Sequence, residues 1–463
     1  MINSWATSGI DLHVDLRVPG RTRALEEGLR QAIIDGRLLA GVRLPSSRSL
    51  AADLGLARNT VVDVYAQLTA EGWLVARQGS GTTVANRPHA PSVADAVARD
   101  APQKYLYDLR PGGPDLSSFP RSAWFAASRR AWTIVPDADL GYGDPRGTLQ
   151  LREALAGYLG RARGVHTTAS NIVICAGFTQ AFGLLCRVLR ARGATAVAVE
   201  CYGLPELRRI AIDAGLSVVP VPVDGDGANL AAVTGVDAAV ITAAHQFPLG
   251  TVLSPGRRRD ALIWARAHDA VIVEDDYDGE FRYDRDPLGA LQGLDPSRVI
   301  YVGTASKTLA PGLRLAWLAL PADLIALVAE AKLLADRHCA VLEQLTLADF
   351  ITSGAYDRHV RRRRLAYRRR RDELVGTLAP GQVEGIAAGL HAVVTLPNGT
   401  SEAEAVDAAA THGLAIEGLD VYRVGSTMHP PALIIGYATP PELSYRSAVA
   451  TLAQVLANIP THA

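Results

Sequence analysis

The chain contains very little lysine. All but three of its 47 lysine and arginine side chains are arginine, and the three lysines are Lys104, Lys307 and Lys332. Arginine stays protonated at any ordinary pH and cannot form an imine, whereas lysine can once its pKa is lowered. Lys307, which stands among hydroxyls and an arginine, is therefore a candidate for amine chemistry.

Cysteine pairs and long apolar runs are also lacking. The four cysteines form no CxxC pair, so neither a disulfide framework nor a metal site is expected. No apolar run reaches the ~18 residues needed to cross a bilayer. The first residues carry Asp11 and Asp15 and lack an apolar signal segment. We therefore expect a cytoplasmic protein with no membrane partner.

Neither sign of charge is in excess, because basic and acidic side chains each number 47. Any DNA binding must therefore be local. A chain of 463 residues is too long to fold around a single hydrophobic core, so we expect two to four domains. Changes in composition and periodicity along the chain predict one domain over 14–86, a linker over 87–107 and a larger domain over 108–463.

The first domain has the pattern of a winged helix-turn-helix. Apolar periodicity predicts helices over 23–35, 48–54 and about 58–70, the second capped by a serine. Residues 72–75 and 82–84 flank a glycine-rich tip and predict a hairpin wing. Periodicity alone suits an ordinary helical subdomain equally well.

The start of the last helix of such a unit enters the major groove, where polar side chains meet base edges. A wing tip can enter the minor groove, where glycine allows close backbone approach. From Ile10 to Arg87 there are ten arginines and eight acidic residues, a modest excess that favours a dimer on two half-sites. The candidate DNA contacts are Arg48, Arg58, Asn59, Thr60, Gln78, Gly79 and Ser80.

From residue 108 onward, apolar β-rich runs alternate with helical patterns. This alternation predicts an α/β domain with a mostly parallel sheet covered on both faces. After about residue 326 long helices dominate, and we expect a smaller α+β subdomain over 326–463. Candidate strands cover residues 172–175, 196–200, 218–223, 239–242, 270–275, 299–302 and 315–320, and, in the smaller subdomain, 392–396 and 433–437.

The larger domain contains a candidate for each group that pyridoxal 5′-phosphate (PLP) requires. Lys307 offers an amine. Asp275 ends a strand on the face shared by Val271 and Val273, where it could pair with the pyridine nitrogen, and Tyr277 could donate to the ring oxygen. Each feature alone also suits an ordinary loop. Hydroxyls, an arginine and a helix N-terminus that suit the phosphate are supplied by Thr304, Ser306, Arg314, Gly177 and Phe178.

Two resemblances join these observations. Leu44-Pro-Ser-Ser-Arg48, Arg58-Asn-Thr60 and Glu71-Gly-Trp-Leu74 closely resemble the GntR-type winged-helix domain, over about 40 residues. The region from about 108 to 457 resembles fold-type I aminotransferases. The combination resembles the MocR-type transcriptional regulators, whose motifs are matched by residues 142–147, 245–250, 274–281 and 306–314.

The resemblance implies roles for single residues. Lys307 would be the Schiff-base lysine, Asp275 and Tyr277 would contact the ring, and Thr304, Ser306 and Arg314 would hold the phosphate. It also implies that Tyr142 reaches the phosphate of the partner subunit in a homodimer. The linker can extend at most ~70 Å, so a head-to-tail, domain-swapped dimer is plausible.

Two positions depart from the usual aminotransferase pattern. Leu204 occupies the slot of the tyrosine that stacks on the ring, so either Tyr202 takes that role or the stacking is aliphatic. Ile434 stands where many such enzymes have an arginine that clamps the substrate carboxylate, and Arg423 is the nearest candidate to bind an effector instead. Both departures weaken the expectation of efficient turnover.

Our main hypothesis is a PLP-binding transcriptional regulator that binds operator DNA. It would sense a small amine, or PLP itself, at Lys307. The alternatives are an active aminotransferase with an accessory DNA-binding head, and a binding protein that has lost PLP chemistry. Two features stay open. The arginine-dense run 358–371 could be a second DNA-contact face or a solvated helix with salt bridges to its neighbours. His245 is expected to have a structural role rather than a catalytic one.

Overall fold

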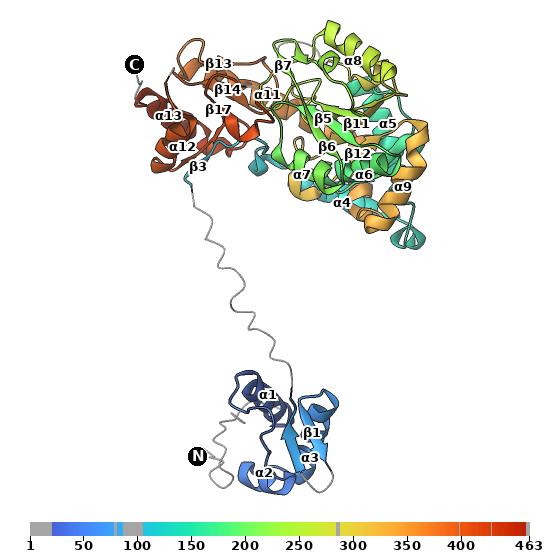
Figure 1. Ribbon diagram of the computed structural model, residues 1–463, viewed down its shortest axis with the longest axis vertical. Coiled ribbons are helices and arrows are strands. Elements are labelled where there is room, and N and C mark those ends of the chain that lie inside the picture. The colour runs from blue at the N-terminus through green and yellow to red at the C-terminus, as the bar shows by residue number, and fades with distance from the viewer. Residues whose placement is uncertain are drawn as a thin grey trace. The chain divides into compact units, whose positions relative to one another are not determined.

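The computed structural model describes residues 21–77, 81–86, 105–283, 288–397, 399–426 and 428–459. These residues form two compact units, one within 1–102 and the other within 103–463 (Figure 1). The wing-tip candidates Gln78, Gly79 and Ser80 lie outside the described residues, as does most of the expected linker. Among the helices described, none has both the length and the apolar composition that a bilayer crossing requires.

The first unit is a three-helix head with a hairpin. Ser46 caps the second helix by accepting a hydrogen bond from the Ser49 amide, and Gly55 ends it with a φ of 65°. In the first helix Leu25 and Leu29 are buried, whereas Ile33 is only half-buried, because Ala32 faces the core. The elements are α1 (Arg21–Ile34), α2 (Ser47–Leu54), α3 (Arg58–Ala70) and the antiparallel strands β1 (Leu74–Arg77) and β2 (Gly81–Val84).

A seven-stranded sheet in the order β4-β12-β11-β10-β9-β5-β6 forms the centre of the second unit. Strand β12 is antiparallel to both of its neighbours, and the other pairs are parallel. The predicted mostly parallel sheet is confirmed. The strands are β4 (Ile172–Cys175), β5 (Ala196–Glu200), β6 (Ser217–Val221), β9 (Ala238–Ile241), β10 (Val271–Asp276), β11 (Val299–Thr304) and β12 (Ala316–Ala319).

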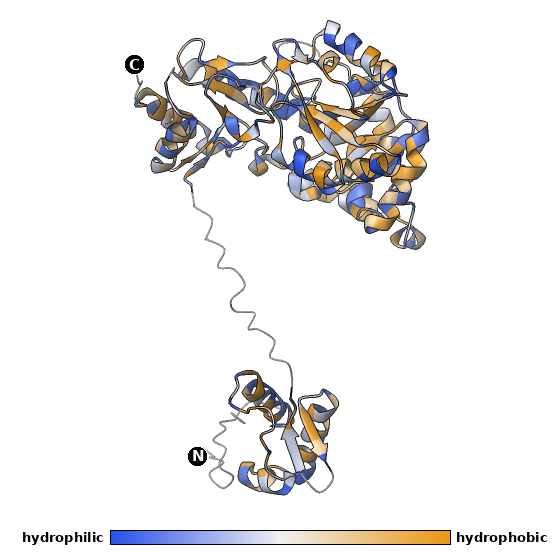
Figure 2. Cartoon of the chain, viewed as in Figure 1, coloured by the Kyte–Doolittle hydropathy of each residue, from blue (hydrophilic) through white to orange (hydrophobic). Residues whose placement is uncertain are grey.

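Helices cover both faces of this sheet, and the central strands are strongly apolar (Figure 2). Alternate strand residues pack into separate clusters, which is why these strands are apolar on both sides. On one face lie α6 (Phe178–Ala191), α7 (Pro205–Asp213) and α9 (Ala322–Asp336); on the other lie α4 (Arg121–Ile134), α5 (Leu149–Arg163), α8 (Pro255–Ala267) and α10 (Val341–Thr352).

A smaller antiparallel sheet in the order β13-β14-β17-β16 lies in the C-terminal part of the unit. The start of the unit also joins this region, because β3 (Tyr107–Asp108) pairs with β15 (Leu414–Ala415). The remaining elements are β7 (Val223–Asp224), β8 (Gly227–Ala228), α11 (Ala355–Thr377), β13 (Val383–Glu384), β14 (Ala392–Thr395), α12 (Glu402–Thr411), β16 (Glu417–Gly418), β17 (Ala432–Ile435) and α13 (Glu442–Ala457).

Candidate functional site

A cavity of about 320 Å³ opens at the carboxyl ends of the parallel strands. Strands β5, β9, β10 and β11 run in the same direction, so their last residues meet at one edge of the sheet, where ligands of open α/β sheets bind. The polar side chains along the cavity are Thr179, Glu200, Thr242, Asp275, Tyr277, Thr304, Ser306, Lys307, Arg314, His391 and Tyr422.

Lys307 follows β11 and extends its ammonium group into this cavity. The Nζ atom donates a hydrogen bond of 2.5 Å to the Gly112 carbonyl oxygen. Burial lowers the pKa of Lys307, while the carboxylates of Asp275 and Asp278 oppose that shift. The amine is therefore closer to its neutral, nucleophilic form than an exposed lysine would be.

Asp275 approaches the cavity from the end of β10. It is buried, and burial raises its pKa well above the ordinary range, although nearby Lys307 pulls the pKa down. A carboxyl group that is buried in this way is ionised more readily when a cationic partner lies beside it. Strand alternation predicts that Asp275 shares a face of β10 with Val273. Both residues lie on the face of the sheet that α6 covers.

Tyr277 is held by a buried histidine and a buried carboxylate. Its hydroxyl lies 3.1 Å from Nδ1 of His245, and the same nitrogen lies 2.8 Å from Oδ2 of Asp278. The rings of His245 and His391 lie 4.9 Å apart. Burial raises the pKa of Tyr277 well above its ordinary value, so the phenol is a neutral hydrogen-bond donor. In the sequence, the only feature that pointed to His245 near this site was its place in the family motif 245–250.

Hydroxyl and guanidinium groups gather at one end of the cavity. The Thr304 hydroxyl bonds the Ser306 hydroxyl at 2.8 Å and accepts from the Ser306 amide. Arg314 has a φ of 51°, a strained value for a residue with a side chain, and its guanidinium donates to the Ala176 carbonyl. A Cβ on Gly177, whose φ is 93°, would lie 2.7 Å from Arg314 Cζ.

The residues present fit PLP on these observations. A bare glycine allows the Arg314 guanidinium to lie against the backbone that precedes α6, whose first N–H groups lack helical partners. Cations, hydroxyls and free amide donors together form an anion site. The same cavity holds an amine, a carboxyl and a phenol, which are the three groups that the ring requires.

Four candidates do not line the cavity: Gly177, which directly precedes the lining residue Phe178, and Tyr142, Tyr202 and Arg423. Tyr142 is 83% exposed, and the Arg337 guanidinium lies 4.4 Å from its ring centroid. Tyr202 is buried, and its hydroxyl accepts from the His429 amide, whereas Leu204 does line the cavity. Arg423 is bound to Asp420 at 2.5 Å.

The DNA candidates of the head occupy exposed helix starts. Arg58 and Asn59 are exposed in the first turn of α3, and Thr60 beside them is half-buried. Arg48 is exposed in the first turn of α2. The opposite face of α3 packs on the core through residues such as Val61 and Leu68, so its polar first turn is left free to meet a ligand.

Comparison with known families agrees with this division of the chain. Residues 21–84 match the bacterial regulatory proteins of the gntR family, and residues 122–443 match aminotransferase class I and II. The "HTH-type pyridoxine biosynthesis transcriptional regulator PdxR" of Corynebacterium glutamicum is 32% identical over 93% of this chain and 95% of its own length. The chain belongs to the MocR-type HTH transcriptional regulators, which combine a gntR-family head with an aminotransferase domain.

Other relatives support the same assignment. The "Probable rhizopine catabolism regulatory protein MocR" of Rhizobium meliloti is 36% identical over 76% of both chains. Among solved structures, the multiple substrate aminotransferase from Thermococcus profundus has a TM-score of 0.68 and 26% identity, and the match covers 77% of this chain and 92% of that one. This MocR-type chain therefore has the aminotransferase fold and is a DNA-binding transcriptional regulator.

Sequence reasoning missed Glu200, a second buried carboxyl group in the cavity of this MocR-type protein. It ends β5 and is 6% exposed. It accepts hydrogen bonds from the Thr242 amide at 3.2 Å, the Thr242 hydroxyl at 2.7 Å and the Gln246 amide group at 3.0 Å. Burial raises its pKa from 4.5 to about 7, although these hydrogen bonds oppose the shift. Glu200 could have been found from its position, because it is an acidic residue at the end of a predicted strand, as Asp275 is.

Replacing Glu200 with glutamine is expected to stabilise the protein at pH 8 and not at pH 4.5. Between pH 4.5 and about 7 the folded state holds a proton that the unfolded state has lost, so the contribution of Glu200 to stability falls as the pH rises. The loss is on the order of 3 kcal/mol at pH 8. Melting temperatures of both proteins across this range measure the effect, and a constant difference between them would contradict it.

Proposed function

We propose that this regulator binds PLP in the cavity at Lys307 and that its DNA binding responds to PLP or to a small amine. When bound, PLP supplies an aldehyde carbon that bonds reversibly to primary amines. The observation that carries the proposal is the convergence of Lys307, Asp275, Tyr277 and Arg314 on one cavity. The genome is its partner, so we infer a cytoplasmic location.

Each of these side chains has a distinct task in the proposal. Lys307, whose pKa burial lowers, provides the attacking nitrogen. Asp275 pairs with the pyridine nitrogen, and Tyr277 donates to the ring oxygen from the position that His245 holds. Thr304 and Ser306, together with Arg314, the turn at Gly177 and the first amides of α6 from Phe178 onward, bind the phosphate.

Among its described residues, the site lacks a free cation where an aminotransferase would bind the substrate carboxylate, and this favours sensing over turnover. Ile434 is fully buried in β17 and offers no charge there. Arg423 is held by Asp420, so its charge is partly neutralised for an incoming carboxylate. Leu204 lines the cavity and offers an aliphatic surface in place of a stacked aromatic ring. An effector amine could react with bound PLP without being held firmly for complete conversion.

A homodimer is the assembly that the surface supports. Large apolar side chains are exposed on and around α4, and a monomer would leave this patch in water. Tyr142 is also exposed and follows α4 in the chain, which is consistent with a role at the partner subunit's phosphate site. A head-to-tail arrangement stays part of this proposal. The exposed residues of the patch are Leu116, Phe125, Trp132, Ile134, Leu140, Tyr142 and Leu149.

Borohydride reduction after PLP loading tests the proposal. The reduced adduct is expected on Lys307 alone, although Lys104 and Lys332 are present as internal controls, because Lys307 lines the cavity and Lys332 is buried against Asp336. Peptide mass spectrometry locates the label. A label on another lysine, or none, would refute the proposed site.

The active-aminotransferase alternative is tested with the loaded protein, an amino acid and an excess of a second α-keto acid, which accepts the amino group and so permits repeated turnover. If the chain is a sensor, keto acid formation stays below one equivalent per site. Sustained production of keto acid over many equivalents would favour the enzyme instead. Lys307→Ala is the matched control, since it removes the nucleophile and leaves the other cavity groups in place.

A further inference from the structure

Helix α11 carries an arginine run with two different faces. It spans 23 residues and contains nine arginines between residues 358 and 371. Some are buried among polar partners and others are exposed. Because these two sets lie on different sides of one helix, they can be assigned separate roles.

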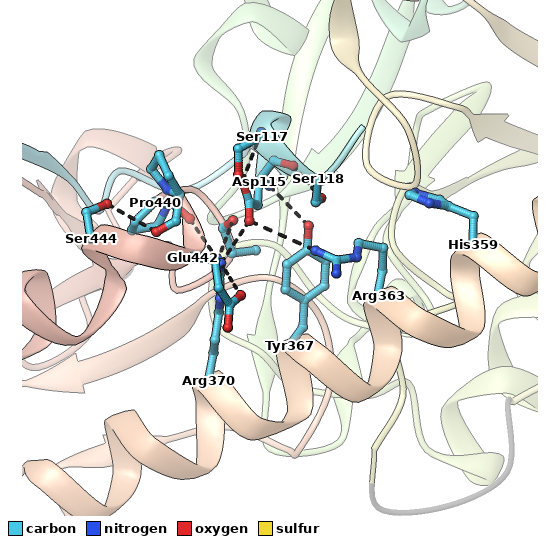
Figure 3. A network of polar contacts seen from close by, with 12 residues as sticks. Asp115, Ser117, Ser118, His359, Arg363, Tyr367, Arg370, Pro440, Glu442 and Ser444 are labelled. Atoms are coloured by element: carbon cyan, nitrogen blue, oxygen red, sulfur yellow. Dashed lines mark hydrogen bonds and ion pairs between the residues drawn. The ribbon is translucent and has the colours of Figure 1, made fainter. Parts of the chain in front are cut away.

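The inner face is a structural network (Figure 3). Arg370 is 3% exposed and bonds Asp115 at 2.8 Å, Glu442 at 2.9 Å and the Pro440 carbonyl at 2.8 Å. Figure 3 shows Arg363 and Tyr367 pointing toward the same Asp115. These contacts tie α11 to the start of the unit and to α13. The interpretation of the run as a helix with salt bridges to its neighbours is correct for this face.

The outer face is a row of exposed arginines that lack such partners. The spacing of three, four, ten and eleven residues from the first member places them along one side of the helix. Within the described part of the chain none of them has an ion pair, although Arg358 donates to the Ser353 carbonyl. Two nearby acids are engaged elsewhere, Asp357 with Arg161 and Glu373 with Arg446, and no ion pair joins the exposed Asp372 to the row in the described structure. The outer row consists of Arg358, Arg361, Arg362, Arg368 and Arg369.

We propose that the outer row binds the phosphates of double-stranded DNA. Like charges three or four residues apart destabilise a helix, and one exposed acid, Asp372, stands against the five arginines of the outer row. The guanidinium group fits phosphate with two parallel hydrogen bonds, and lysine, which does so less well, is absent from the whole helix. The row spans about 16 Å, the length over which a duplex presents about ten phosphate charges.

DNA is a better match than an acidic protein because the chain already binds DNA through its head. That head has only a small excess of basic residues, and the whole chain has none. A second phosphate-binding row would therefore supply attraction that the head lacks. The inference goes beyond the proposed function, since it needs neither PLP nor an effector.

The salt dependence of DNA binding by the full chain tests the outer row. The probe is a 60-base-pair duplex of random sequence, titrated between 50 and 200 mM KCl. The variant Arg362→Gln/Arg368→Gln/Arg369→Gln removes three charges for which no hydrogen bond or ion pair is found in the described structure. The slope of log affinity against log salt should become shallower by about 2 to 3, because each phosphate contact contributes about 0.9. Affinity at 100 mM should fall at least tenfold.

The matched control is Arg187→Gln/Arg209→Gln/Arg259→Gln, three exposed arginines on α6, α7 and α8. It removes the same net charge, and its slope should stay close to that of the wild type. Equal slopes for the outer-row variant and the wild type would overturn the proposal and point to an acidic protein partner. Equal losses in both variants would overturn it too, because they would reflect net charge alone. Unchanged melting temperatures establish that both variants are folded.

Discussion

Replacing Arg58 with alanine is expected to lower the affinity for a specific DNA site at least about 30-fold and to change binding of random DNA far less. Arg58 is the first residue of α3 and is exposed. A bidentate contact between arginine and guanine contributes about 1–3 kcal/mol of discrimination. A dimer on two half-sites loses two such contacts, and 2 kcal/mol corresponds to about 30-fold.

The measurement needs a site chosen by the protein itself. A duplex selected from a random library with the wild-type chain serves as the specific probe, and a scrambled duplex serves as the reference. Arg23→Ala is the matched control, because Arg23 is exposed on α1 and outside the proposed reading helix. An Arg58→Ala variant that keeps the wild-type ratio of the two affinities would remove α3 from the role of reading helix.

Many boundaries could be predicted because local patterns determine them. The run 172–175 and the run 196–200 are buried on both faces, so their continuous apolar sequences mark strands β4 and β5 with their observed limits. The third helix of the head, predicted from Arg58 to Ala70, was found with those ends.

Proline chemistry explains one boundary that differed. A single strand was expected over 218–223, but β6 ends at Val221 and β7 begins at Val223. Pro222 has no N–H to donate, so the ladder is interrupted there. Pro220 is tolerated within β6 because this strand lies at the edge of the sheet.

The composition of the cavity was only partly visible in the sequence. Lys307, Asp275 and Tyr277 stood out because each has a chemical role of its own. Glu200 and His391 did not. For Glu200 the reason is strand order, which the sequence does not encode locally and which places the end of β5 beside β9, one strand away from β10. The contact between His245 and Tyr277 likewise joins residues 32 positions apart.

Replacing Gly177 with alanine is expected to weaken PLP binding at least about 100-fold. The new Cβ would lie 2.7 Å from Arg314 Cζ, so the guanidinium would have to leave its place beside the Ala176 carbonyl. The clashing atoms lie at the far end of the Arg314 side chain, so the guanidinium makes room by moving away from the turn that would hold the phosphate. The phosphate would lose at least two charge-assisted contacts, each worth about 1.5–3 kcal/mol.

Gly193→Ala is the control for an alanine at positive φ that meets no neighbouring atom. Gly193 follows the other end of α6 with a φ of 98°, close to the 93° of Gly177, but a Cβ there would meet nothing within 4 Å. Gly177→Ala should lose more stability than Gly193→Ala, because a ψ of 167° places Gly177 in a region that essentially only glycine adopts. Spectroscopic titration with PLP should find normal affinity in Gly193→Ala alone. Equal PLP affinities in the two variants would mean that Arg314 and the turn before α6 do not hold the phosphate.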